Sequence, residues 1–385
     1  MPTSQLPAES AGANAHAGGA GRPGGERAVR RWRQDVRCRA TAMLAGFVRE
    51  RCAERLCGVP GAEFVTGLLA EYAAGGKYVR STFAYLGWLA GGAGDSDAAL
   101  RAAASMEMLH AFALLQDDVM DRSAVRRGRP AAHVRLADWH RAHGAAGDAG
   151  RFGESAAVLL GDLCLVWAEQ LLRESGLGAA ALGRAWPYYD TLRGELAVGQ
   201  LTDLAFDARC RPALAEVLEM SRRKSGNYTV RRPLELGAAL AGCDEPVIRV
   251  LGVYGGLVGE AFQMRDDLLG VFGKPDVTGK PNADDLRERK ATSLVVLAGE
   301  MASPAQREQL DLLCERDVLT EAEVARWRGL IEETGAPARI EQMIGHRVAV
   351  ALASLDSAAA EGAPLDPFVL SALRDLAVGA TCRDR

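Results

Sequence analysis

Apolar residues recur at intervals of three and four along nearly the whole chain beyond residue 28, as in the runs 100–115 and 158–171. That spacing places them on one face of an α-helix. No sustained alternation of apolar and polar residues, the pattern of a half-buried strand, interrupts it. Glycine-rich or polar breaks at 91–95, 144–148, 176–178, 242–246 and 273–275 are too short to separate two domains. The sequence therefore predicts one all-α domain over residues 28–385, built from roughly ten helices.

Composition narrows the class of protein. Residues 1–27 are dominated by Gly, Ala, Pro and Ser, so we expect a disordered tail there. The chain carries 46 Lys and Arg against 50 Asp and Glu, and this net charge of −4 gives no general attraction to nucleic acid. The sequence contains no uninterrupted apolar run of about 18 residues, so we do not expect integral membrane association. The N-terminus before Arg22 lacks the positive charges and the apolar core of a signal peptide. Eight cysteines without a CxxC pair favour free thiols in a reducing cytoplasm over a zinc site.

A first acidic motif follows the apolar run 106–115. Asp117 and Asp121 are four residues apart and project side by side from a helix, with Asp118 flanking them. Carboxylates that repel one another on one helical face favour a cation between them, and oxygen ligands suit Mg²⁺ or Mn²⁺. The alternative is a solvated acidic helix end. The apolar character of the preceding run is atypical of a surface helix and favours the metal.

A second acidic motif closes another apolar run, 253–261. Gln263, Asp266 and Asp267 share one helical face at three- and four-residue spacing. Two helices that each end an apolar stretch in adjacent carboxylates predict a cavity lined with metal ligands from both sides. The natural anionic bridge between cations in such a cavity is a diphosphate.

Basic residues are interleaved with the two acidic motifs. Each alone is more typical of a solvated surface charge, but their interleaving indicates an anion-binding cavity. Arginine binds phosphate in a bidentate manner, whereas lysine acts as a point charge. Two glycines directly before Lys77 would let backbone approach an anion closely. The basic set comprises Lys77, Arg80, Arg126, Arg127, Lys224, Lys280 and Lys290.

These motifs together, in this order between about residues 75 and 290, resemble those of the trans-isoprenyl diphosphate synthase family (polyprenyl synthetases). The region from about residue 30 to residue 380 also fits the length of that family. The resemblance implies an all-α, single-domain fold of antiparallel helices around a deep central cavity, the isoprenoid synthase type, and a homodimer. It further implies a prenyltransferase that joins isopentenyl diphosphate head to tail (1'-4) to allylic diphosphates.

The same resemblance assigns roles to individual residues. Asp117 and Asp121 would hold two Mg²⁺ with support from Asp118, and Asp266 would hold a third, backed by Gln263 and Asp267; Mn²⁺ could substitute. The allylic diphosphate would be bound by Arg126, Lys224 and Lys280, and isopentenyl diphosphate by Lys77, Arg80, His110 and Arg127. Lys290 resembles a later active-site lysine of the family. The catalytic set, which would stabilise the departing charge and the allylic cation, is Lys224, Ser225, Tyr228 and Gln263.

Two residues before the first acidic motif bear on product length. Phe112 lies five positions before Asp117 and the small Ala113 lies four before it, so both project toward the floor of the expected apolar tunnel. A bulky residue followed by a small one, with no insertion in the acidic motif, resembles one class of geranylgeranyl diphosphate synthases. We therefore expect a twenty-carbon product, with a farnesyl or other short-chain product as the alternative.

Two departures from the family pattern and two rival functions remain. Gln116 stands where histidine is frequent, and Gly270 stands where a third aspartate of the second motif is common, which weakens the expected support of the third metal.

A class I terpene cyclase would have no use for Lys77, Arg80 and Arg127 together. A non-catalytic partner subunit would be expected to lack an acidic motif. The histidines at 133, 140 and 143 are interpreted as partly exposed side chains and not as a metal site.

Overall fold

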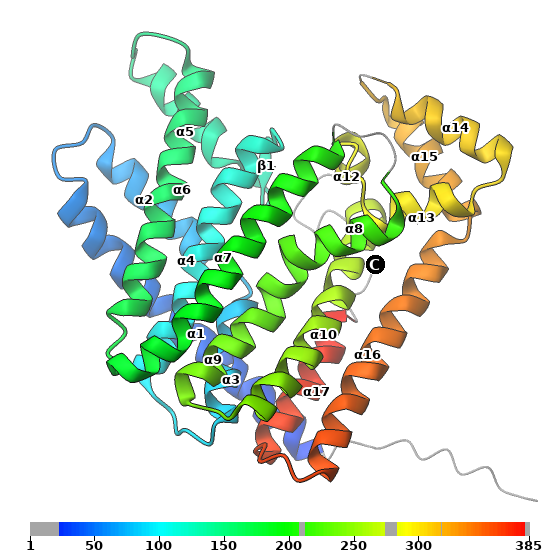
Figure 1. Cartoon of the computed structure of the whole chain (residues 1–385). Helices are drawn as coiled ribbons and strands as arrows, with labels where there is room; N and C mark the ends of the chain where they lie inside the picture. Colours follow the sequence, from blue (N-terminus) through cyan, green and yellow to red (C-terminus); the bar gives the residue numbers. More distant parts are fainter. Residues whose placement is uncertain (1–22, 208–211, 274–282, 317, 382–385) are drawn as a thin grey trace, which may run out of the picture.

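The computed structural model describes residues 23–207, 212–273, 283–316 and 318–381. Within these residues the chain is almost entirely helical, which confirms the predicted all-α fold (Figure 1). The first ten α-helices are α1 (Pro23–Arg55), α2 (Ala62–Ala74), α3 (Val79–Ala90), α4 (Asp97–Met120), α5 (Ala132–Ala142), α6 (Ala149–Arg173), α7 (Ala179–Asp207), α8 (Leu214–Ser221), α9 (Arg232–Ala241) and α10 (Glu245–Phe272). The others are α12 (Asp284–Arg287), α13 (Ser293–Met301), α14 (Pro304–Cys314), α15 (Glu321–Glu333), α16 (Ala336–Ala360) and α17 (Pro367–Thr381). A π-helix, η1 (Arg222–Arg231), joins α8 to α9, and two short strands, β1 (Val125–Arg126) and β2 (Arg129–Pro130), form a hairpin after α4.

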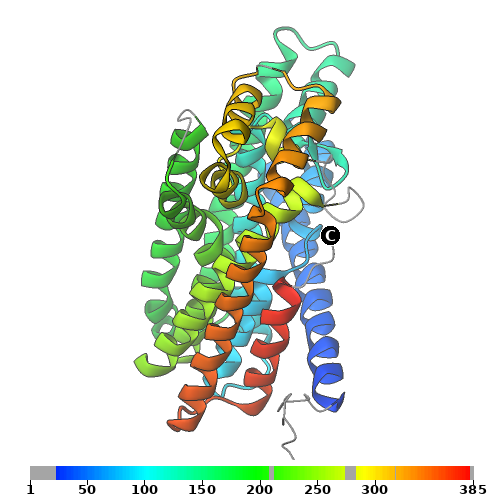
Figure 2. The same cartoon turned by 90° about the vertical axis from the view of Figure 1, so that its right-hand side faces the viewer.

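The long helices run side by side along one axis and give an elongated bundle (Figures 1 and 2). Three clusters of buried apolar side chains hold them together. One joins α1, α2, α4, α6 and α7; a second joins α3, α9, α10, α16 and α17; a third joins α10 to the helices from α12 to α16. Because α10 takes part in the second and third clusters, the end of α10 is fixed by packing on two sides.

Helix α4 carries the first acidic motif into the bundle. Its N-terminus is capped by Ser96, whose Oγ accepts a hydrogen bond from the Ala99 N–H at 3.2 Å. Two helices, α4 and α6, are long and apolar enough to span a membrane by length and composition. The apolar window of α4 is 67% buried inside the protein, which is the pattern of a core helix. In its C-terminal turn Asp118 is buried, Asp117 and Asp121 are half-buried, and Met120 is exposed.

Four of the five predicted breaks, at 91–95, 144–148, 176–178 and 242–246, lie where one helix ends and the next begins, and the fifth begins where α10 ends and runs into residues outside those described. Gly242, for example, follows α9 with a positive φ of 80°, the left-handed conformation that ends many helices. The expectation of roughly ten helices was too low: sixteen α-helices lie within the described residues, because short polar turns divide the segment after α10. Helix α1 begins at Pro23, inside the segment assigned to the tail, while residues 1–22 lie outside the described residues.

Candidate active site

Asp117 and Asp121 lie at the C-terminal end of α4, where each faces a lysine from a distant part of the chain. Lys224 Nζ lies 3.3 Å from Asp117 Oδ1, and Lys290 Nζ lies 2.6 Å from Asp121 Oδ2. Lys224 belongs to η1 and Lys290 follows α12, so the fold brings two other segments of the chain to the end of α4. The predicted interleaving of acidic and basic residues is thus a set of direct ion pairs in the structure.

The lysines set the charge state of the paired carboxylates. Burial disfavours the charged form of Asp117, but the neighbouring Lys224, Lys290 and Arg126 outweigh burial and lower its pKa to about 2. Burial and the negative charge of Asp117 raise the pKa of Asp121. Asp117 is therefore ionised at neutral pH within a compact, mixed-charge cluster.

Asp118 points to a different side of α4 from Asp117. Its carboxylate is fully buried, with a relative exposure of 0%. It accepts hydrogen bonds from the Tyr72 hydroxyl at 3.1 Å and from Arg126 Nε at 2.7 Å, and Arg126 Nη2 makes a second contact with it. The Tyr72 hydroxyl in turn accepts a hydrogen bond from the Ala132 N–H. Asp118 thereby fixes the guanidinium of Arg126 beside Asp117, to which Arg126 Nη2 lies at 3.4 Å.

The two aspartates of the second acidic motif also have different surroundings, as Asp117 and Asp118 do. Asp267 is buried, and both atoms of its carboxylate are engaged: Oδ1 accepts from Gln263 Nε2 at 2.8 Å, and Oδ2 accepts from the N–H and hydroxyl of Ser293. Asp267 thus ties α10 to the first residue of α13. Asp266 is half-buried on the neighbouring side of α10, while Arg265 turns away and bonds Glu341 on α16.

Asp203 on α7 is a site residue that the sequence did not reveal. Lys224 Nζ donates a hydrogen bond to Asp203 Oδ2 at 2.6 Å, so the lysine bridges Asp203 and Asp117. Glu288 is a second such residue, with Lys290 Nζ at 2.8 Å from its Oε2. The only signal for Asp203 was its spacing of four residues from Asp207 in a helical run, which is not specific enough to select it.

The hairpin β1–β2 presents three arginines around a recess of 240 Å³. Its central residues, Arg127 and Gly128, have φ values of 54° and 74°, which is the combination of a type I′ turn. The Arg127 guanidinium lies directly against the backbone of Gly75, where a Cβ atom would collide with it. One glycine before Lys77 thus admits a guanidinium, which is a closer contact than the sequence alone predicted. The recess is lined by Glu71, Tyr72, Gly75, Arg126, Arg127, Arg129 and Pro130.

Arg80, His110 and Tyr228 form a further group beside this recess. The Arg80 guanidinium lies 4.2 Å from the centre of the Tyr228 ring and donates a hydrogen bond to the Thr229 hydroxyl. Burial, reinforced by the charge of Arg80, lowers the pKa of His110 well below its usual range, so its imidazole is neutral. His110 Nδ1, the Tyr228 hydroxyl and Arg80 Nε are buried and have no hydrogen-bond partner within the described part of the chain. Buried polar atoms that lack partners indicate a polar ligand at this position.

The remaining predicted residues are placed as follows. Ser225 and Tyr228 lie on η1, and a π-helix often marks a functional site. Phe112 and Ala113 are half-buried on α4 and pack against the first apolar cluster. Lys77 is exposed in the turn between α2 and α3. Lys280 lies outside the described residues.

Gln116 and Gly270, the two departures from the family pattern, lie on α4 and α10. Gln116 turns away from the acidic motif, because its Nε2 donates to Asp162 Oδ1 on α6 at 2.8 Å. Gly270 is on α10, one turn beyond Asp266. Within the described residues the three histidines form no metal-binding group. The expectation of partly exposed side chains was wrong for His140, which is buried against Phe152, whereas His143 is exposed and stacks on Trp139.

The residues present fit a hard divalent cation. Asp117 Oδ1 is buried and, across the described residues, accepts no hydrogen bond, although Lys224 lies 3.3 Å away. A buried carboxylate oxygen without a hydrogen bond is suited to a metal ion, and oxygen donors are those that Mg²⁺ prefers. No three His, Cys, Asp or Glu side chains in the described ranges form a metal-binding group by themselves. The carboxylates are neutralised instead by lysine and arginine side chains of the chain itself.

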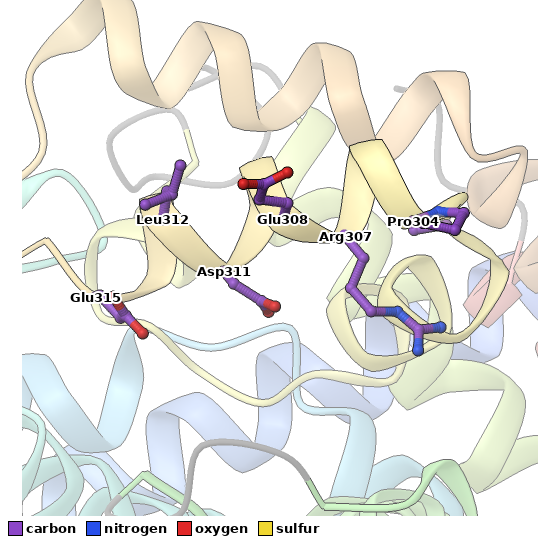
Figure 3. Close-up of a pocket in the computed structure, with 7 residues that line it drawn as sticks. Pro304, Arg307, Glu308, Asp311, Leu312 and Glu315 are labelled. Carbon is purple, nitrogen blue, oxygen red and sulfur yellow. The ribbon is translucent and has the colours of Figure 1, made fainter.

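Other recesses lie away from these motifs. Figure 3 shows one along α14, where the labelled Arg307, Asp311 and Glu315 line a surface recess to which no predicted site residue contributes. A neighbouring cavity of about 510 Å³ between α7, α13 and α14 extends to Lys290. The chemistry predicted from the sequence is therefore concentrated at the ends of α4 and α10 and not along α14.

Comparison with known proteins shows the family of the chain. Residues 63–331 match the family described as Polyprenyl synthetase. The chain is 34% identical over 267 residues to geranylfarnesyl diphosphate synthase of Aeropyrum pernix, covering 68% of this chain and 77% of that protein. It is 34% identical over 284 residues to geranylgeranyl diphosphate synthase of Mycobacterium tuberculosis, covering 74% and 75%. It is also 37% identical over 217 residues to (2E,6E)-farnesyl diphosphate synthase of the same organism, covering 56% and 55%.

A solved structure gives the same result for the fold. The crystal structure of geranylgeranyl pyrophosphate synthase from Corynebacterium glutamicum, complexed with isoprenyl diphosphate and magnesium, superposes with a TM-score of 0.83 at 35% identity. The match covers 91% of this chain and 98% of that one. The named relatives differ in product length, so the comparisons establish the class of reaction and leave the product open.

Proposed function

Because this chain belongs to the polyprenyl synthetase family and is therefore a prenyltransferase that makes isoprenyl diphosphates, we propose that its product is geranylgeranyl diphosphate. The reaction would be the head-to-tail (1'-4) condensation of isopentenyl diphosphate with an allylic diphosphate. One observation supports the proposed condensation: Asp117 and Asp121 face Lys224 and Lys290 at one helix end, beside an arginine-lined recess. The length of the product rests on Phe112 and Ala113. Opposite charges in that arrangement suit a diphosphate held with cations.

The lysines and Arg126 would hold the allylic diphosphate. In the ligand-free arrangement the Lys224 and Lys290 ammonium groups neutralise Asp117 and Asp121. Divalent cations, three Mg²⁺ in this proposal with Mn²⁺ as a substitute, supply Lewis-acid neutralisation of the leaving group when bound. Lys224 and Lys290 can then turn their ammonium groups to diphosphate oxygens. Asp203 retains Lys224 within reach throughout, because it holds the same ammonium at 2.6 Å.

Isopentenyl diphosphate would lie on the other side, against the hairpin. Arg127 and Arg80 offer guanidinium groups for bidentate phosphate contacts, and neutral His110 offers a hydrogen-bond donor. The polar oxygens of Ser225 and Tyr228 would stabilise the allylic cation as the diphosphate leaves. The departing diphosphate is the base in this proposal, so no dedicated histidine or carboxylate base is needed.

The wild-type protein tests the proposal directly. Purified enzyme with Mg²⁺ and isopentenyl diphosphate is given five-, ten- or fifteen-carbon allylic primers, and the dephosphorylated products are sized by chromatography. A twenty-carbon alcohol as the main product is expected. A fifteen- or twenty-five-carbon product would overturn the product assignment and keep the enzyme class. Cyclic hydrocarbon made without isopentenyl diphosphate would indicate a cyclase, and absence of turnover would indicate a partner subunit.

Phe112→Ala is expected to lengthen the product by at least one five-carbon unit. Phe112 and Ala113 lie half-buried one turn before Asp117, where a bulky ring would stop a growing chain. Removal of the ring opens the space below it. Product chromatography decides the outcome, with Phe368→Ala as the matched control, since Phe368 is half-buried like Phe112 but packs on Trp32 of α1, away from the acidic motifs. An unchanged product profile for Phe112→Ala would contradict its role as the floor.

We also propose that the enzyme is a homodimer that acts in the cytoplasm. Phe152, Leu159 and Val166 recur every seven residues along α6, and the last two are 63% and 62% exposed. A stripe of exposed apolar residues on one helix suits a symmetric contact with a second copy. The six described cysteines are free thiols, which suits a reducing compartment.

The double variant Leu159→Glu/Val166→Glu is expected to be monomeric at micromolar concentration, because charges on the stripe oppose its burial. Sedimentation velocity would compare it with the wild type and with Leu312→Glu, a change at an equally exposed leucine on α14 with 58% exposure. The wild type and the α14 variant should both sediment as dimers. A monomeric wild type would contradict the proposed dimer.

A further inference from the structure

Gly270 on α10 stands where a third aspartate of the second acidic motif is common in the family. It lies four residues after Asp266, so the two positions share one face of the helix. A Cβ atom built at Gly270 would overlap the carboxylate of Asp285, which belongs to the short helix α12. The space that a side chain at position 270 would need is therefore already taken by a carboxylate from another part of the chain.

The approach of Asp285 is fixed by packing of the backbone that carries it. Leu286 is fully buried in the same apolar cluster as Leu268 and Val271 of α10. The Lys290 N–H donates a hydrogen bond to the Asp285 carbonyl at 2.9 Å, which closes the turn after α12. The carboxylate of Asp285 thus lies against α10 because the whole turn is seated there.

The same turn connects the two acidic motifs. Its Lys290 forms the ion pair with Asp121 on α4, while its Asp285 lies over Gly270 on α10. Asp285 is half-buried and belongs to this same turn, so it is not an isolated surface group.

We propose that Asp285 supplies the carboxylate that the second acidic motif lacks at Gly270, and so supports the divalent cation that Asp266 would bind. The choice of Mg²⁺ with a diphosphate as the ligand rests on the proposed function. A side chain at position 270 would displace the Asp285 carboxylate from this place, because the two would occupy the same space. The site therefore has one carboxylate at this place, and in this chain it comes from Asp285 of α12 and not from position 270 of α10.

A position swap tests this assignment. The proteins are the wild type, Asp285→Asn, Gly270→Asp and the double variant Gly270→Asp/Asp285→Ala. The probe is Mg²⁺ titrated at a fixed concentration of inorganic pyrophosphate, with the thermal midpoint and calorimetric heat as readouts, so no turnover is needed. Asp285→Asn should raise the half-saturating Mg²⁺ concentration about tenfold or more, the usual effect of losing a supporting carboxylate.

The double variant should return the half-saturating Mg²⁺ concentration to within about threefold of wild type, since the carboxylate is moved and not lost. Gly270→Asp alone should lower the thermal midpoint without metal, because it overlaps Asp285. Glu321→Gln is the matched control: Glu321 pairs with Arg287 of the same helix α12, but its side chain is 87% exposed. This control should leave Mg²⁺ dependence unchanged and so separates loosening of α12 from loss of the carboxylate.

Two results would overturn the assignment: an Asp285→Asn protein with wild-type Mg²⁺ dependence, or a double variant no better than Asp285→Asn. Circular dichroism of each variant without metal verifies the fold, and the conservative Asp285→Asn keeps the shape of the side chain. A wild type that binds Mg²⁺ with pyrophosphate but makes no prenyl diphosphate would contradict the proposed function alone. The assignment of Asp285 would stand in that case.

Discussion

Asp117→Asn is expected to lower kcat by about a thousandfold, the scale for loss of one preorganised electrostatic contact to developing charge, while the protein stays folded. Asp117 combines a pKa lowered to about 2 with an Oδ1 atom that is buried and, within the described residues, accepts no hydrogen bond. Asparagine keeps the shape and removes the charge. Lys224 keeps a partner in the variant, because Asp203 still holds it at 2.6 Å, so no buried ammonium is left alone.

The measurement is steady-state turnover of isopentenyl diphosphate with an allylic primer at saturating Mg²⁺. Asp162→Asn is the control, since Asp162 is an exposed carboxylate on α6 that contacts Gln116 next to the motif. We expect turnover of the control to remain within about twofold of wild type, as is usual for a surface change away from the chemistry. Comparable turnover of Asp117→Asn and the wild type would remove Asp117 from the catalytic machinery.

Asp118→Ala is expected to destabilise the fold by about 3 kcal/mol, the low end for breaking a buried ion pair. The change removes a carboxylate with 0% exposure and leaves Arg126, whose side chain is 15% exposed, with only the longer contact to Asp117. It also removes the acceptor of the Tyr72 hydroxyl. Urea denaturation would give the change in the free energy of unfolding.

Two companion variants sharpen this stability measurement. Tyr72→Phe leaves the Ala132 N–H without its acceptor and should cost about 1–3 kcal/mol. Because Tyr72 and Asp118 share one network, the double variant should cost less than the sum of the single changes. Asp138→Asn, which alters an exposed pair with Arg141, should stay within about 0.5 kcal/mol of wild type. A loss below about 1 kcal/mol for Asp118→Ala would show that the buried network is not a stability element.

The contrast between Asp117 and Asp118 shows where sequence reasoning stops. Adjacent carboxylates look equivalent in the pattern, yet successive residues of a helix point about 100° apart. Asp117 faces Lys224, whereas Asp118 faces Tyr72 and Arg126. Which of two neighbours faces the lysines depends on what packs around the helix, and no local pattern contains that information.

The second acidic motif gives another case in which a contact depends on a residue distant in the sequence. The sequence indicated a missing carboxylate at Gly270 and could only predict weaker metal support. The structure places Asp285 over that position, from a turn fifteen residues further along the chain. Asp203 and Glu288 were missed for the same reason, because their role depends on Lys224 and Lys290, which come from other elements.

The sequence by itself determined the helical class, several of the breaks between helices and the two acidic motifs with basic residues around them. Each of these depends on residues within a few turns of one another, where helical spacing alone fixes neighbours. Only the tertiary structure decided which carboxylates pair with which cations and where Asp285 lies. Those contacts join α4, α7, η1, α10 and α12, and they form because burial of apolar side chains fixes the distances between helices far apart in the chain.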